Sequence, residues 1–197
     1  MVVTGDLLGL SLSAFLDALA DEDPAPGGGS AAAIAVTMAA GLCAKAARAS
    51  PDWPEARAAV AQAEQLRRRT APLAQSDAEA YEEALAALHL PSELEAEVRN
   101  MALGQVLARA AEIPLVIAEA SADAASLAAL VAERGTLERR GDAVTAALLA
   151  EAAARAAADL VVGNLTVAPD DPRAIRARSV AEAASTSARE ALASAQT

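Results

Sequence analysis

Aromatic residues, cysteine and histidine are almost absent from this sequence. Phe, Tyr and Trp together make up 2 % of its 197 residues, and there is one cysteine, Cys43, and one histidine, His89. A single cysteine cannot form an internal disulfide, and one cysteine with one histidine is too few for a zinc site. The sequence therefore predicts no metal centre. We expect Cys43, which lies inside an apolar run, to be a buried thiol without a chemical role.

Strand-forming residues are too scattered to build a sheet. The hydrophobic share is nevertheless 54 %, and alanine supplies most of it. Alanine is the best helix former because its side chain loses no entropy in a helix. We therefore predict an all-α fold, in which small side chains allow the helix axes to approach closely.

Positive charge is scarce, and no apolar run is long enough for a bilayer. The formal net charge of −11 would repel a nucleic acid backbone. Residues 1–6 lack the basic start and apolar core of a signal peptide. The longest apolar stretch, residues 31–44, is too short to span a membrane and predicts a buried helix. We expect a cytoplasmic protein that binds neither nucleic acid nor membrane.

The basic residues gather in three clusters along the chain. We expect these clusters to be solvated helix faces that carry ion pairs, although a local basic group would be needed to bind an anionic substrate. The clusters are Arg67 to Arg69, Arg139 with Arg140, and Arg173 with Arg176 and Arg178.

Hydrophobic periodicity and helix-stop signals divide the chain into long helices. Pro72 and Pro114 fall inside two of them and should kink them, because proline removes a helical hydrogen bond. Ser30 is the expected N-cap of the second helix. The expected helices span residues 11–20, 30–50, 54–88, 92–135, 142–162 and 172 to near the C-terminus. Short loops between them imply an up-and-down bundle of long, partly kinked helices, with residues 1–197 as a single domain. We expect an alanine-rich face to be buried in a homodimer.

The first candidate site is the run Pro26-Gly27-Gly28-Gly29-Ser30. Glycines can adopt positive φ and let the backbone approach a ligand closely. The free amides and the dipole of the helix that follows favour an anion or a carbonyl oxygen. The run is not a Walker loop, because no Lys-Ser or Lys-Thr pair follows it. Equally, the glycines could serve only a tight turn and close helix packing.

The second candidate is Asp77, with Tyr81 four residues further along the same helix face. Its neighbours are mostly alanine, so the carboxylate is expected to be partly buried, which is costly unless it is paired or used. An exposed charge on a long helix is the simpler alternative. Asp142 and Asn164 are weaker candidates, because a helix cap and a helix terminator would explain them.

Taken in order, residues 15–19, 26–31, 77–81, 112–115, 142–143 and Asn164 resemble the cyclodeaminase/cyclohydrolase part of the formiminotransferase-cyclodeaminase family. The resemblance runs from about residue 11 into the last helix. Its most specific part is the Pro-Gly-Gly-Gly-Ser stretch, and the other matches carry weight only as a series. Residues 135–141 and 159–163 depart from the family pattern, which bears on the choice of substrate.

The resemblance implies a dimeric all-α enzyme acting on a tetrahydrofolate one-carbon substrate, with no further cofactor. Members either release ammonia from 5-formiminotetrahydrofolate or hydrolyse 5,10-methenyltetrahydrofolate to the 10-formyl form. Both reactions act on a cationic carbon between two nitrogens, which a carboxylate can stabilise and serve with a proton. Asp77 and Asp142 are the catalytic candidates, with Asp77 the better one. The candidate substrate-binding residues are Pro26, Gly27, Gly28, Gly29, Ser30, Tyr81 and Asn164.

Two other functions stay open at this point. A non-catalytic helical protein that binds a partner through its alanine-rich face would show no folate binding. An enzyme of the same fold acting on another amidine or amide would have carboxylates in its pocket but no folate affinity. Basic residues facing the glycine run would favour folate, because the folate tail is anionic.

Overall fold

The computed structural model describes residues 6–88, 96–165 and 170–194. These ranges are helical, with no strand, which confirms the all-α prediction. The elements are η1 (Leu7–Gly9), α1 (Leu12–Ala20), α2 (Gly28–Arg48), α3 (Ala56–Thr70), α4 (Leu73–Leu88), α5 (Ala96–Ala110), α6 (Glu112–Arg134), η2 (Leu137–Arg139), α7 (Arg140–Asn164) and α8 (Pro172–Ser194).

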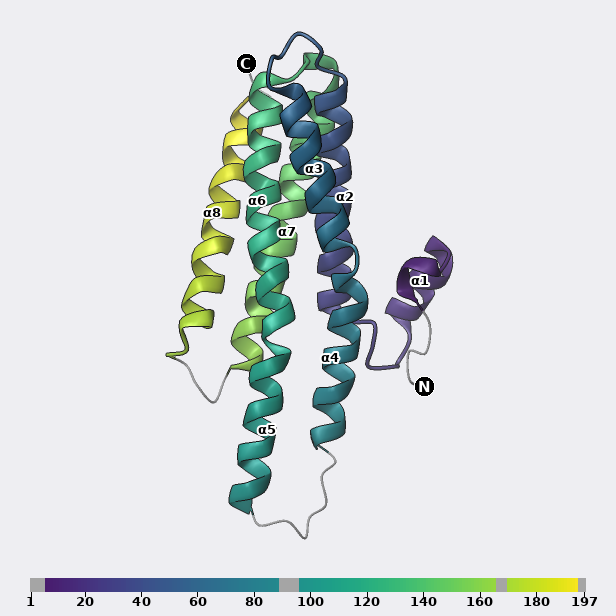
Figure 1. The fold of residues 1–197 in the computed structure, drawn as a ribbon, viewed down its shortest axis with the longest axis vertical. Helices are drawn as coiled ribbons and strands as arrows, with labels where there is room; N and C mark the ends of the chain where they lie inside the picture. Colours follow the sequence, from purple (N-terminus) through teal and green to yellow (C-terminus); the bar gives the residue numbers. More distant parts are fainter. Residues whose placement is uncertain (1–5, 89–95, 166–169, 195–197) are drawn as a thin grey trace.

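The long helices run up and down beside one another (Figure 1). α2 packs against α3, α6 and α7, and α8 packs against α6 and α7. The α4 and α5 helices extend past the lower end of the other helices, and α1 projects from the bundle on the α2 side (Figure 1). The up-and-down arrangement is the one that the short connections predict.

Two helix breaks lie at the predicted prolines. α3 ends at Thr70 and α4 begins beyond Pro72, while α5 gives way to α6 just before Pro114. Proline cannot donate the hydrogen bond that would continue the ladder, so the predicted kinks are full interruptions. The predicted helix start at residues 91–92, like His89, lies outside the described residues.

Two predicted helix starts are wrong by a few residues. α2 begins at Gly28 with Gly27 as its N-cap, whereas Ser30 is already inside the helix. Ser30 does not cap because the helix has already begun two residues earlier, and its hydroxyl instead donates to the Ala74 carbonyl at 2.7 Å. α7 begins at Arg140, so Asp142 lies in its first turn rather than at its cap.

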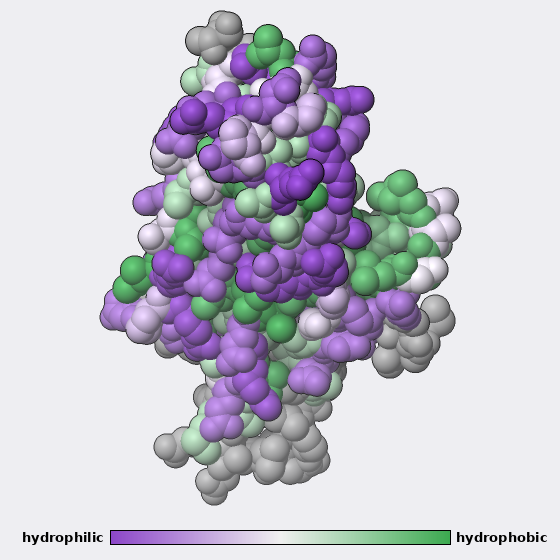
Figure 2. All heavy atoms as spheres, turned by 45° about the horizontal axis from the view of Figure 1, so that its top comes forward, coloured by the Kyte–Doolittle hydropathy of each residue, from purple (hydrophilic) through white to green (hydrophobic). Residues whose placement is uncertain are grey.

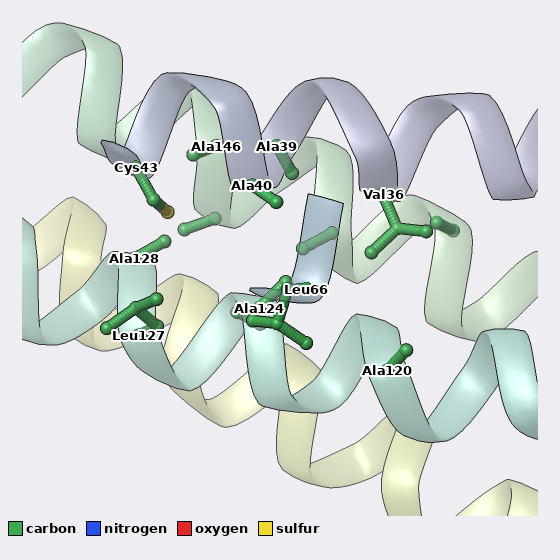
Figure 3. Close-up of a cluster of buried hydrophobic side chains, with 14 of the residues drawn as sticks. Val36, Ala39, Ala40, Cys43, Leu66, Ala120, Ala124, Leu127, Ala128 and Ala146 are labelled. Atoms are coloured by element: carbon green, nitrogen blue, oxygen red, sulfur yellow. The ribbon is translucent and has the colours of Figure 1, made fainter. Parts of the chain in front are cut away.

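The core is built largely from alanine. Val36, Ala40 and Cys43 of α2 face Ala124 and Leu127 of α6 (Figure 3). Such small side chains let the helix axes pack closely, as predicted. Cys43 is fully buried, as predicted, and burial raises the pKa of its thiol to about 12.

Two helical stretches combine membrane-spanning length with high hydropathy. α2 and residues 101–134 are long and apolar enough to cross a bilayer. However, 56 % and 61 % of their most apolar windows are buried inside the bundle, as in core helices of a folded protein.

The arginine clusters carry ion pairs, as expected. Two of the five pairs join different helices, and the other three join residues no more than three positions apart in the sequence. The face of the molecule in Figure 2 carries many hydrophilic residues. Each pair is at least partly exposed, so it contributes little to stability on its own. The pairs are Arg67 with Glu64, Arg69 with Asp123, Arg139 with Asp142, Arg173 with Asp171, and Arg176 with Glu119.

Candidate active site

A pocket of about 270 Å³ opens where the glycine-rich start of α2 meets α4, the α5–α6 break and the end of α7. It brings together residues that are far apart in sequence and that were singled out for chemistry, namely Gly27, Gly28, Gly29, Asp77, Tyr81 and Asn164. The remaining wall is mostly apolar and consists of Pro24, Ala25, Ala78, Ala110, Pro114 and Leu160.

The Asp77 carboxylate packs directly on the backbone of Gly29. A Cβ added to Gly29 would overlap both carboxylate oxygens of Asp77, whereas one added to Gly28 would meet nothing within 4 Å. No glycine in the described ranges has a positive φ. The expectation that positive φ explains these glycines is therefore wrong, and Gly29 is instead required for close approach.

Ser30 lies beneath the pocket rather than in its wall. Its side chain is 0 % exposed, and its Oγ is 3.4 Å from Asp77 Oδ2 and 2.7 Å from the carbonyl oxygen of Ala74. Its backbone N–H also donates to the Asp77 carboxylate. Pro26 is likewise buried and does not line the pocket. The structure thus places these two residues behind the glycine surface.

Burial raises the pKa of Asp77, and the hydrogen bonds from Ser30 only partly oppose this shift. Among the described residues, no lysine or arginine lines the pocket. The described part of the pocket therefore supplies no cation to hold Asp77 ionised. A carboxyl group with a pKa raised in this way is suited to give and take a proton.

Asn164 closes the pocket on the α7 side through a hydrogen bond to the α5–α6 break. Its Nδ2 donates to the Ala110 carbonyl at 3.1 Å. In an unbroken helix that carbonyl would accept from residue 114, but Pro114 has no N–H. One N–H of Nδ2 is used in this bond, so Asn164 can still offer a ligand its second N–H as a donor and Oδ1 as an acceptor.

Asp142 lies away from this pocket. Its Oδ2 is 3.0 Å from Lys45 Nζ and 3.6 Å from Arg139 Nη1. Lys45 lies fifteen residues beyond Ser30 on α2, a separation of about 22 Å along the helix. Within one chain, therefore, the structure does not bring Asp142 and Asp77 together.

The apolar part of the wall was not foreseen. Pro114 had a signal, since it belongs to a family-like segment, but it was interpreted only as a kink. Leu160 and Ala78 look like ordinary core residues, and nothing local marks them as pocket residues. Among the described residues, no group of three His, Cys, Asp or Glu side chains is placed to hold a metal ion.

Comparison with known proteins gives consistent matches over most of the chain. The family model described as formiminotransferase-cyclodeaminase matches residues 11–190. A methenyltetrahydrofolate cyclohydrolase from Methylorubrum extorquens is 33 % identical over 157 residues, which cover 75 % of this chain and 76 % of that protein. The crystal structure of a formiminotetrahydrofolate cyclodeaminase from Thermotoga maritima has the same fold, with a TM-score of 0.79 at 24 % identity, and the match covers 97 % of this chain and 96 % of that one. The chain therefore belongs to the formiminotransferase-cyclodeaminase family.

Proposed function

We propose that this protein is a cytoplasmic folate enzyme that hydrolyses 5,10-methenyltetrahydrofolate to 10-formyltetrahydrofolate. The observation that carries the proposal is Asp77, a half-buried carboxyl group with a raised pKa that faces a pocket with no lysine or arginine among its described lining residues. The similarity to a methenyltetrahydrofolate cyclohydrolase over three quarters of the chain supports the choice of substrate.

The substrate carbon lies between N5 and N10 and carries positive charge. Ionised Asp77 stabilises that charge and accepts a proton as water attacks the carbon. The neutral tetrahedral intermediate then collapses. The bond from N5 to the carbon breaks, Asp77 returns its proton to N5, and the new hydroxyl loses its proton to solvent as it becomes the formyl oxygen. The balance is one water consumed and one proton released.

The polar groups of the pocket suggest which part of the folate enters it. The Asp77 carboxylate already lies against Gly29 and the Ser30 amide, so a substrate carboxylate placed there would meet a like charge. A volume of about 270 Å³ is at the small end for ligand pockets and suits a ring rather than a whole folate. The pterin ring would then donate to Asn164 Oδ1, with the glutamate tail directed outward past Tyr81, which is 44 % exposed.

A homodimer would supply the cation that the tail needs. On the outer face of α2, Met38 is 51 % exposed between half-buried Ile34 and Leu42. If two copies pair these faces antiparallel about Met38, the partner's Lys45 comes beside Ala31, because both residues are seven positions from Met38. Asp142 would then hold Lys45 at the neighbouring pocket.

The direct test is spectrophotometric loss of 5,10-methenyltetrahydrofolate with purified protein, measured against the spontaneous rate in buffer. Acceleration that is absent in Asp77→Asn supports the proposal. Without acceleration, ammonia release from 5-formiminotetrahydrofolate is the second assay, since that substrate presents the same kind of carbon to Asp77. Inactivity in both assays rules the folate proposal out and favours another amidine or amide substrate.

The dimer has its own test. Met38→Asp should give a monomer in light scattering and a higher KM, because a charge is placed at the proposed two-fold axis. The matched control is Ile175→Asp, because Ile175 is 60 % exposed on α8. Figure 1 shows α8 on the opposite side of the bundle from α2. A dimer that survives Met38→Asp would exclude this interface.

A further inference from the structure

The start of α2 has an unusual occupant. The first turn of a helix offers free backbone amides that attract an anion, commonly one from a ligand. Here the group in contact with Gly29 and with the Ser30 amide is the carboxylate of Asp77. The glycine-serine sequence therefore receives an anion that belongs to the protein itself.

We infer that Ser30 is a positioning residue for Asp77 and not a contact for substrate. The inference rests on the proposed function, because it takes Asp77 to be the group that moves the proton. Ser30 is 0 % exposed, and Gly28, Gly29 and Asp77 line the pocket above it. A substrate that fills the pocket meets these residues and does not reach the Ser30 hydroxyl.

The Ser30 hydroxyl joins α2 to α4 at two points of the same turn. Its single O–H is shared between two acceptors, the Ala74 carbonyl at 2.7 Å and, more weakly, Asp77 Oδ2 at 3.4 Å, three residues further along α4. The first contact fixes the height of the α4 backbone against α2. The second contact, with the Ser30 N–H, fixes the direction in which the carboxylate faces the pocket.

The surroundings leave few other groups to set the behaviour of Asp77. Its neighbours from α2 are Gly29 and Ser30, and the rest of the described wall contributes apolar side chains and the neutral Asn164. Tyr81 is the only other titratable residue in the described wall. Ser30 is therefore the main source of hydrogen bonds that oppose the effect of burial on the pKa of Asp77.

The experiment replaces the hydroxyl in Ser30→Ala and compares it with a matched control. Ser121→Ala removes another fully buried hydroxyl that also donates to a helix carbonyl, that of Ile117, at 2.7 Å. In Ser30→Ala we expect kcat to fall about tenfold with KM within about twofold, and the pH limb of Asp77 to move up, because the variant keeps the Ser30 N–H but loses the hydroxyl contact. Ser121→Ala should change neither kcat nor the pH profile.

Two results for Ser30→Ala would overturn the inference. A raised KM with an unmoved pH limb would make Ser30 a substrate contact and overturn the inference, as would kinetics identical to wild type. If Ser30→Ala does not fold, Ser30→Cys keeps the size with a weaker donor and should shift the limb in the same direction by less.

A substrate-independent measurement separates this inference from the proposed function. NMR titration of ¹³C-labelled aspartate carboxyl groups, with the signal assigned through Asp77→Asn, should show the pKa of Asp77 higher in Ser30→Ala than in wild type. If both folate assays fail, the proposed function fails, and the titration alone still decides whether Ser30 positions Asp77.

Discussion

Asp77 and Asp142 are both aspartates on alanine-rich helices, yet their surroundings are opposite. Asp77 is half-buried at the start of α2, in a pocket whose described wall has no cation, and burial raises its pKa. Asp142 lies toward the far end of α2, where Lys45 and Arg139 both pair with it. A carboxylate matched by two cations is suited to hold a geometry, whereas one without a cation is suited to transfer a proton.

The largest effect should come from Asp77→Asn. Turnover of 5,10-methenyltetrahydrofolate should fall by about a thousandfold, because the variant cannot accept or return a proton. Steady-state kinetics would measure this loss, on protein shown to be folded and to have the same oligomeric state as wild type. An active Asp77→Asn enzyme would show that Asp77 is not the proton-transfer group, and the contrast with Asp142 would no longer hold.

The same variant should not lose stability at neutral pH. Because burial raises the folded-state pKa of Asp77, the native state binds this proton more tightly than the unfolded chain does, and stability falls as pH rises through the interval between the two pKa values. Asn binds no such proton. The Tm of the Asp77→Asn variant at pH 7 should therefore equal that of wild type or exceed it by up to about 3 °C. Below about pH 4 the variant should have no higher Tm than wild type. A large Tm loss at pH 7 would mean that Asp77 is mainly structural.

The second effect compares neighbouring glycines. Gly29→Ala puts a Cβ where the Asp77 carboxylate lies, so the carboxylate must move and kcat should fall about a hundredfold. Gly28→Ala has open space and should stay within about threefold of wild type in kcat. Both changes replace a helical glycine by alanine, so the helix propensity is matched. Equal kinetics in the two variants would contradict the close packing of Asp77 on Gly29.

This pair of glycines also shows how far the sequence alone could go. The run of three glycines predicted a site at a helix start, and the structure sets it against Asp77, Tyr81 and Asn164. Local patterns cannot tell which glycine is needed, because the contact that decides it comes from α4. Gly29 is the position at which a side chain would collide with Asp77, and only the packing of α4 on α2 reveals this.

The fold, too, could be predicted where local chemistry decides it and not where contacts between helices decide it. Alanine content and the two internal prolines were sufficient to predict long helices and their breaks, because both act through local backbone chemistry. The start of α2 was missed because Gly28 and Gly29, which look like loop residues, already belong to the helix, where Gly29 lies against Asp77 of α4. Asp142 looked like a helix cap for a similar reason, since its partner Lys45 lies on another helix.

A third, smaller effect should follow from Asn164→Ala. The change removes the donor to the Ala110 carbonyl and the acceptor proposed for the pterin, so we expect about 1 kcal/mol less stability and a KM about tenfold higher. Pro114→Ala supplies a backbone N–H that can bond to the same carbonyl. The double variant should therefore recover Tm in thermal melts without recovering KM. Recovery of both values would show that Asn164 acts only on the structure.

The smallest effect should come from Asp142→Asn. Its ion pairs are partly exposed and worth at most about 1 kcal/mol, so Tm should fall only slightly, kcat should stay within about twofold and KM should rise a few-fold as Lys45 loosens. Glu64→Gln is the matched control, because Glu64 also pairs with two basic side chains, Arg48 and Arg67. It should lower Tm to a similar extent and leave KM unchanged.

The opposite result for Asp142→Asn would be equally informative. If kcat fell as far as in Asp77→Asn, Asp142 would be a catalytic residue that reaches the pocket of the partner subunit. Mixing the two inactive variants would then restore activity, because each heterodimer would contain one pocket with both carboxylates intact. If the mixed protein exchanges subunits and stays inactive, the two residues do not act across the interface. Asp142 would then act through Lys45 and the packing of α7 on α2, and proton transfer would rest on Asp77 alone.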